Sequence, residues 1–172
     1  MKRNKMLWIF FIIPVVIAIY YLYPGQQLPS GKTIDRLVVH KAARKMEAWS
    51  GNELLKTYSV SLGKDPIGHK QFEGDCKTPE GSYTINARNP NSAYYKNLGI
   101  SYPNAADKAT AAKQGKSPGG DVKIHGLRNG RGYIGKFHRW KDWTAGCIAV
   151  TNEEMEELYK AVKEDAVIEI LP

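Results

Sequence analysis

Cysteine and histidine are scarce in this chain of 172 residues, which has two cysteines and four histidines. A single disulfide would be little scaffold for a domain of this size. No closely spaced pairs of metal ligands occur, so neither a metal site nor a cofactor is predicted. We find no internal repeat and no nucleic-acid-binding motif. The basic residues behind the formal charge of +8 are scattered rather than gathered in a stripe, so a nucleic-acid partner is not predicted.

Charge is also missing from Leu7 to Tyr23, an apolar run that three basic residues precede. About 17 apolar residues is the lower limit for a helix that crosses a bilayer. The run ends in the bulky stretch Tyr20-Tyr21-Leu22-Tyr23-Pro24, which resembles an interfacial aromatic belt and offers no small-residue cleavage site. We therefore predict an uncleaved anchor rather than a signal peptide. Residues 1–24 would be a cytoplasmic stub and a single transmembrane helix, with the rest outside the cytoplasmic membrane.

The remainder reads as a linker over residues 25–32 and one folded domain over residues 33–172. Composition is that of a globular protein, with 42% hydrophobic and 24% charged residues. Runs of β-branched and alternating residues predict strands. The predicted strands are Ile34–His40, Lys45–Trp49, Leu54–Leu62, Ser82–Ile85, Val122–His125 and Ala166–Leu171.

Two helices interrupt these strands. Asn104 is a suitable cap for an alanine-rich helix over 105–114, which Gly115 would end. Thr151 and Glu154 form a capping box for a second helix, whose apolar residues recur with helical spacing. The sum is a mostly β fold with a few helices. The sequence does not determine the oligomeric state.

Cys147 follows the small residues Ala145 and Gly146, and His125 ends a short apolar strand upstream. A histidine within hydrogen-bond reach of a cysteine can remove the thiol proton and stabilise an imidazolium–thiolate pair. The small residues let the backbone approach a substrate closely. We therefore predict that N–H groups around Gly146 and Cys147 stabilise an oxyanion, which is worth roughly 3 to 4 kcal/mol of barrier.

Two alternatives remain for the cysteine. Cys147 can be an inert buried residue, or it can pair with Cys76 in a disulfide, which we regard as the lesser alternative. His138 is a second candidate for the base, ranked behind His125.

Aromatic residues fill the segment between the two motifs. Tyr133, Phe137, Trp140 and Trp143 accompany His138 there. They favour either local packing of the loop, which we prefer, or an aromatic groove for substrate, in which Tyr133, His138, Trp143 and the motif residue Thr144 would contribute.

The run Ile124-His125-Gly126, followed by Thr144-Ala145-Gly146-Cys147-Ile148, resembles the catalytic motif of the L,D-transpeptidase family. Asp75, Thr78-Pro79-Glu80-Gly81 and Ser101-Tyr102-Pro103-Asn104 are also similar to stretches seen in that family. The resemblance covers the chain from about Ile34 to its end. It implies a β-sandwich-like catalytic domain.

The resemblance also implies roles. Cys147 would be the nucleophile that attacks the carbonyl before a terminal D-alanine of a peptidoglycan stem peptide. His125 would be the base and then the acid, oriented by the backbone carbonyl of Gly126. An amine of a second stem peptide would then attack the thioester. The biological roles that the resemblance implies are cell-wall biogenesis and cell shape.

Three features depart from the family pattern. Ala145 and Ala149 stand where many members have histidine and arginine, so a substrate carboxylate would need another partner. The gap between His125 and Cys147 is longer than usual, and its residues 127–142 are candidates for a lid or flap.

Three functions follow, in order of preference. The first is a transpeptidase held at the inner membrane with its domain on the periplasmic side. The second is a peptidoglycan carboxypeptidase or endopeptidase with the same Cys-His site. The third is a wall-binding module without catalysis.

Overall fold

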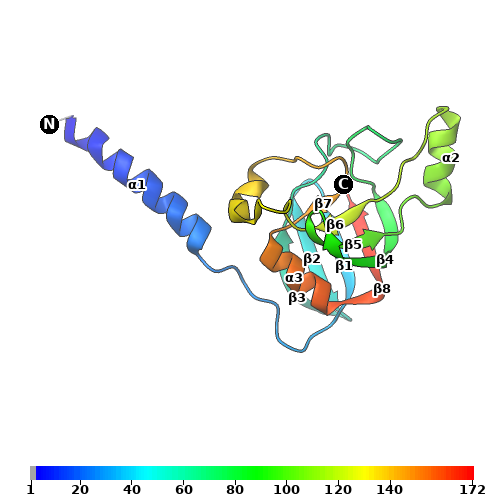
Figure 1. Cartoon of the computed structure of the whole chain (residues 1–172), viewed down its shortest axis with the longest axis horizontal. Helices are drawn as coiled ribbons and strands as arrows, with labels where there is room; N and C mark the ends of the chain where they lie inside the picture. The colour runs from blue at the N-terminus through cyan, green and yellow to red at the C-terminus, as the bar shows by residue number, and fades with distance from the viewer. Residues whose placement is uncertain (1–2) are drawn as a thin grey trace.

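The computed structural model describes residues 3–172, and side chains from residue 12 onward. Its helices are α1 (Arg3–Leu22), α2 (Ala105–Lys113) and α3 (Asn152–Ala161), with a 3-10 segment η1 (Gly132–Trp140). Its strands are β1 (Ile34–His40), β2 (Lys45–Ser50), β3 (Glu53–Ser59), β4 (Gly81–Ser92), β5 (Tyr95–Ile100), β6 (Lys123–His125), β7 (Ile148–Ala149) and β8 (Val162–Leu171). Figure 1 shows α1 projecting from a domain that contains all the strands.

Within residues 3–172, the strands form one eight-stranded sheet in the order β3-β2-β1-β8-β4-β5-β6-β7. The chain just after β3 returns to the opposite edge, where Ser61 bridges Ala149 of β7 and Gly63 bridges Thr144. The sheet is therefore rolled into a half-barrel. The prediction of a mostly β fold with a few helices is confirmed. The sandwich-like description is corrected, because one sheet curls over the core.

Strand β4 belongs to both parts of the curled sheet and joins them. Its first residues, Gly81 to Thr84, pair with β8, and the stretch from Ile85 onward pairs with β5. The register shifts between Ile85 and Ala87, and such irregularities bend a strand. The apolar core fills the curl. Its largest fully buried apolar members include Leu37, Met46, Tyr58, Leu62, Leu98, Ile124, Ile148 and Leu158.

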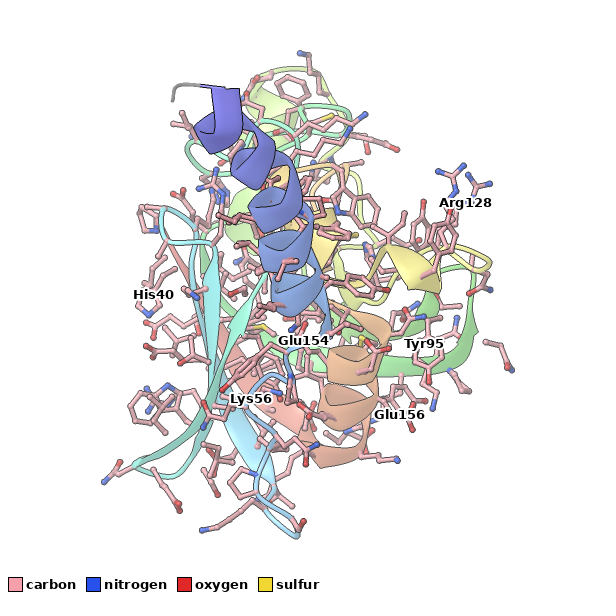
Figure 2. The ribbon with its side chains drawn as sticks, turned by 90° about the vertical axis from the view of Figure 1, so that its left-hand side faces the viewer. His40, Lys56, Tyr95, Arg128, Glu154 and Glu156 are labelled. Atoms are coloured by element: carbon pink, nitrogen blue, oxygen red, sulfur yellow. The ribbon has the colours of Figure 1, made fainter. Side chains whose placement is uncertain are left out.

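Helix α3 covers the sheet directly after β7. Thr151 caps it and Glu154 completes the predicted capping box. Met155 and Leu158 are buried on its inner face. On its outer side, Glu156 accepts a hydrogen bond from the Tyr95 hydroxyl at 2.9 Å, and Figure 2 shows both residues. The helix thus fixes β5 and the chain that leaves β7.

The N-terminal helix differs from the prediction. Among residues 3–172, none of the helices combines the length and apolar character needed to cross a membrane. The predicted transmembrane anchor is therefore unsupported, and the stub residues Met1 and Lys2 lie outside the described part of the chain. The aromatic belt is also reinterpreted, because Tyr21 stacks on Phe137 of η1 at 5.1 Å and donates its hydroxyl proton to Tyr133 O at 2.6 Å.

The remaining elements test the local predictions. The strands at 34–40, 45–49 and 166–171 and the helix capped by Asn104 are found, with small changes at their ends. The predicted strand 54–62 ends at Ser59. The strand predicted at 82–85 is much longer, and β5 was not predicted at all.

Candidate active site

Cys147 and His125 are brought together by two short parallel strands. β6 and β7 pair with Ile124 opposite Ile148 and His125 opposite Ala149. Cys147 immediately precedes β7, so it lies at the start of one strand while His125 lies at the end of its neighbour. Both side chains line one cavity of about 510 Å³. The pairing of distant segments thus places a thiol and an imidazole in the same space.

Thr144 holds the turn before the cysteine. Its hydroxyl donates to the carbonyl of Cys147 at 2.7 Å and accepts from the N–H of Gly146 at 3.1 Å. The predicted oxyanion donor at Gly146 is therefore used inside the turn. The N–H groups of Ala145 and Cys147 are the candidate donors that this turn leaves. Thr144 acts on the turn, although it also lines the cavity.

Gly146 has no room for a side chain. Its φ is +135°, in the region that disfavours other residues, and a Cβ would lie 2.7 Å from the carbonyl oxygen of Lys77. Close packing of the turn on the 63–77 loop therefore requires glycine.

That loop is itself held by a buried ion pair. Lys70 Nζ lies 2.7 Å from Asp75 Oδ1, and the two side chains are 5% and 4% exposed. The Asp75 carboxylate also accepts the backbone N–H groups of Gln71, Phe72 and Lys77. Burial opposes ionisation, but the bonds from Lys70 and the backbone outweigh it and lower the pKa of Asp75. A charged pair thus supports the floor beneath the cysteine turn.

The Cys147 thiol lies between two backbone groups. Its S–H donates to the carbonyl of Asp121 at 3.5 Å. Burial raises the pKa of the Cys147 thiol, while the backbone N–H and the ammonium of Lys123 act in the opposite direction. The net result favours the neutral thiol.

His125 is held by its own neighbour in the chain. Its Nδ1 donates to the carbonyl of Gly126 at 2.7 Å, the contact that the resemblance implied. This bond leaves Nε2 as the basic nitrogen of the neutral ring. Tyr94 and Trp143 pack on the ring at 4.8 and 5.6 Å between centroids.

Burial is the largest influence on His125 and lowers its pKa, although the bond to Gly126 opposes this. Burial therefore acts against the charged form of both partners. Both shifts favour a neutral thiol and a neutral imidazole over the ion pair expected from the sequence.

His138 occupies a different place from the one predicted. It is 6% exposed, does not line the cavity, and contacts the Ser61 hydroxyl through Nδ1 at 3.1 Å. Burial, with the nearby Arg139 charge, lowers its pKa to about 3. Its ring packs edge-on against Trp143 at 6.5 Å. His138 therefore supports Trp143 from behind the cavity.

Of the other aromatic residues predicted to contact substrate, one lines the cavity and one does not. Trp143 lines the cavity, whereas the Tyr133 side chain is 75% exposed and lies outside it. None of the lining residues comes from 127–142, so that segment is not a lid over this cavity. Instead it contacts the end of α1. Both cysteines are unpaired, so the structure holds no Cys76–Cys147 disulfide.

Sequence reasoning missed much of the cavity lining. The missed residues are Lys64, Asn89, Asn91, Ser92, Ala93, Tyr94, Asn97, Asp121 and Lys123. Alternation along β6 could have indicated Lys123, which stands two residues before His125 and so shares its face. The asparagines gave no such signal, because asparagine is depleted in strands and their segment was not recognised as a hairpin.

Fold and site together define the class: a mostly β half-barrel with a cysteine and a histidine in one cavity, which is the L,D-transpeptidase fold. The structure of Mycobacterium tuberculosis L,D-transpeptidase 1 shares this fold, with a TM-score of 0.50 and 15% identity over 80% of this chain and 60% of that one. The chain belongs to the YkuD family, whose model is described as the L,D-transpeptidase catalytic domain and matches residues 34–170.

Two further relatives are similar. "Putative L,D-transpeptidase YafK" of Escherichia coli K12 is 32% identical over 114 residues, which are 64% of this chain and 38% of the relative. A mutant of the helical cell shape determining protein Pgp2 of Campylobacter jejuni is 25% identical, with a TM-score of 0.59, and the match covers 81% of this chain and 47% of that one. This chain thus spans less than half the length of either protein.

Proposed function

We propose that this protein is an L,D-transpeptidase that acts on peptidoglycan stem peptides through a thioester on Cys147. Membership of the YkuD family supports the class of reaction. The single observation that carries the mechanism is that Cys147 and a histidine with a fixed tautomer share one cavity. A role in cell shape, as for Pgp2, is part of the same proposal.

The proton begins on sulfur, because burial favours the neutral form of both groups. As Cys147 Sγ attacks the carbonyl that precedes a terminal D-alanine, its proton passes to Nε2 of His125. The backbone N–H groups of the turn stabilise the developing oxyanion. His125 then returns the proton to the leaving amine, D-alanine departs, and a thioester remains. An amine of a second stem peptide attacks this thioester, and the thiol is restored.

The substrate also determines where the protein must act. Peptidoglycan lies outside the cytoplasmic membrane, so we place the domain on that side. Accessibility of the domain to a protease added to intact spheroplasts would test this placement, and protection until lysis would contradict it.

The reaction is tested with the purified full chain and disaccharide-tetrapeptides, with products weighed by mass spectrometry. Crosslinked dimers with released D-alanine are expected from the wild type, together with a protein species heavier by the acyl group. Cys147→Ala should abolish all three signals, and Cys76→Ala is the matched control that should keep them. Equal product profiles for wild type and Cys147→Ala would end the catalytic proposal.

Two further outcomes refine it. Tripeptide and free D-alanine without dimer would mean that water resolves the thioester, as in a carboxypeptidase. Loss of activity in His138→Ala with full activity in His125→Ala would transfer the base to His138.

A further inference from the structure

A row of three polar side chains crosses the sheet beside the cysteine. Asn97 of β5 stands opposite His125 of β6, and Asn89 of β4 stands opposite Asn97. Directly opposed residues on one face have Cβ atoms about 4.5–5.5 Å apart. All three line the same cavity. The carboxamides of Asn97 and Asn89 therefore extend the polar lining of the cavity from His125 across the neighbouring strands.

Asn97 is a largely buried residue whose carboxamide faces the cavity. The residue is 5% exposed, and within residues 12–172 its side chain has no hydrogen bond to another residue. The carboxamide is nevertheless not one of the buried unpaired groups, so its polar atoms open to the cavity. Its cavity position gives the carboxamide access to a ligand that would supply the bonds the fold does not.

Other asparagines near the site show the contrast. Asn129 accepts from Tyr95 N at 2.9 Å and donates to Ser92 O at 3.0 Å. Asn152 accepts from Leu127 N at 2.8 Å. These side chains hold the fold together, so their groups are occupied. The Asn97 side chain makes no comparable hydrogen bond within residues 12–172.

One of the two polar atoms of the Asn89 side chain is hydrogen-bonded within the protein. Its Oδ1 accepts from the backbone N–H of Asn91 at 2.8 Å, which leaves its Nδ2 as a donor toward the cavity. Asn89 thus offers a donor, and Asn97 offers both a donor and an acceptor.

Of the charged lining residues, Lys64 and Asp121 bond to the cysteine turn through their backbone groups, and Lys123 stands on β6 two residues before His125. The Lys64 N–H is bonded to the Thr144 carbonyl, and the Asp121 carbonyl accepts from Cys147. The Lys123 ammonium pairs with the Asp121 carboxylate at 3.3 Å. The row of asparagines is therefore neutral, and it matches an uncharged ligand group that both donates and accepts.

We propose that Asn97 and Asn89 form a subsite for main-chain peptide groups of the stem peptide. A peptide group carries one N–H and one C=O, which are complementary to the two ends of the Asn97 carboxamide. Since Asn97 adjoins His125, it binds the peptide group nearest the reacting carbonyl, and the Asn89 donor binds the carbonyl of the next. This inference rests on the proposed function, because it names the part of that substrate which the row recognises.

The test combines a substitution with a change in the ligand. Binding is measured by calorimetry in the Cys147→Ala protein, which cannot turn over the peptide. The probes are a stem tetrapeptide ending in D-alanine and its esters, in each of which one main-chain N–H is replaced by oxygen. Asn97→Leu removes the carboxamide at similar volume. Asn52→Leu, in the exposed turn before β3, is the matched control.

We expect Asn97→Leu to weaken binding of the tetrapeptide about tenfold, the worth of one buried hydrogen bond. One ester should bind about tenfold more weakly than the amide in the parent protein and equally in Asn97→Leu. Asn97→Ala should repeat this if the leucine variant does not fold. Equal binding by the parent and Asn97 variants, or an ester penalty that Asn97→Leu retains, would overturn the subsite.

The outcomes separate the two proposals. Binding that depends on Asn97 without any turnover by the wild type would contradict the proposed function and keep the subsite. Turnover with kcat and KM unchanged in Asn97→Leu would contradict the subsite and keep the function. Absence of both binding and turnover would contradict both.

Discussion

The two walls of the cavity are built differently. The cysteine wall, residues 144–147 on the 63–77 loop, has its side-chain polar groups paired inside the protein, through Thr144 and through the buried Lys70–Asp75 pair, and leaves only backbone N–H groups of the turn open. The hairpin wall, residues 89–97 of β4 and β5, presents Asn97 without a partner. A wall with satisfied bonds is rigid and positions reacting atoms, whereas one with open bonds is available to a ligand. Substitutions in the first should therefore alter stability and rate, and those in the second should alter binding.

The largest effect is expected beneath the cysteine wall. Asp75→Ala would leave the Lys70 ammonium buried without its counter-ion and three backbone N–H groups without an acceptor. Breaking a buried pair in this way lowers the free energy of unfolding by about 3–5 kcal/mol. Urea denaturation measures this. Asp65→Ala, in an exposed pair with Lys77, is the control and should cost less than about 1 kcal/mol. Similar losses in both variants would contradict the supporting role of the pair.

Thr144→Val tests the turn itself. Valine keeps the shape but loses the bonds to Gly146 and Cys147, so the sulfur is positioned less well. A misplacement of about 1 Å costs on the order of 100-fold in rate, so kcat should fall by about that factor while KM changes little. Thr144→Ser retains the hydroxyl and should recover most of the rate. A rise in KM alone would indicate that Thr144 acts in substrate binding rather than in positioning the sulfur.

Acid should weaken the support behind the cysteine wall. The pKa of His138 falls from 6.5 to about 3 in the folded protein, so below pH 6.5 the unfolded chain binds a proton that the folded protein does not. Its contribution to stability is complete above pH 6.5 and is lost as the pH falls toward 3, at about 1.4 kcal/mol per pH unit. Urea denaturation at pH 7, 6 and 5 should show a shallower decline in His138→Gln than in the wild type. His40→Gln, on the outer strand face in Figure 2, is the control. Identical slopes in wild type and His138→Gln would refute the assignment.

The smallest effect is expected at the far end of the hairpin wall. Asn89→Ala removes the donor and also the exposed acceptor of the Asn91 N–H, so KM should rise about threefold, with kcat unchanged and stability little altered. Steady-state release of D-alanine measures this. A loss of kcat comparable to that of Thr144→Val would show that the hairpin wall also positions the reacting atoms and does not act in binding alone.

Sequence reasoning worked best where the signal is local. The Asn104 cap and the capping box of Thr151 with Glu154 depend on residues at most three apart, and the starts of α2 and α3 follow from them. The β1 boundaries follow from one β-branched run. β5 and the second half of β4 were missed, because asparagine, proline and glycine in residues 86–99 contradict strand propensity. Pairing between neighbours outweighs that propensity.

The sequence by itself determined which residues carry reactive groups. The motifs around His125 and Cys147 name the pair, and Gly126 follows His125 in the chain, so its carbonyl is always within reach. Only the tertiary structure decided the rest. Parallel pairing of β6 with β7 joins the two motifs, and pairing with β5 puts Asn97 beside His125. Burial then raises the pKa of the thiol and lowers that of the imidazole, since removal of water penalises charge and is a property of the whole fold.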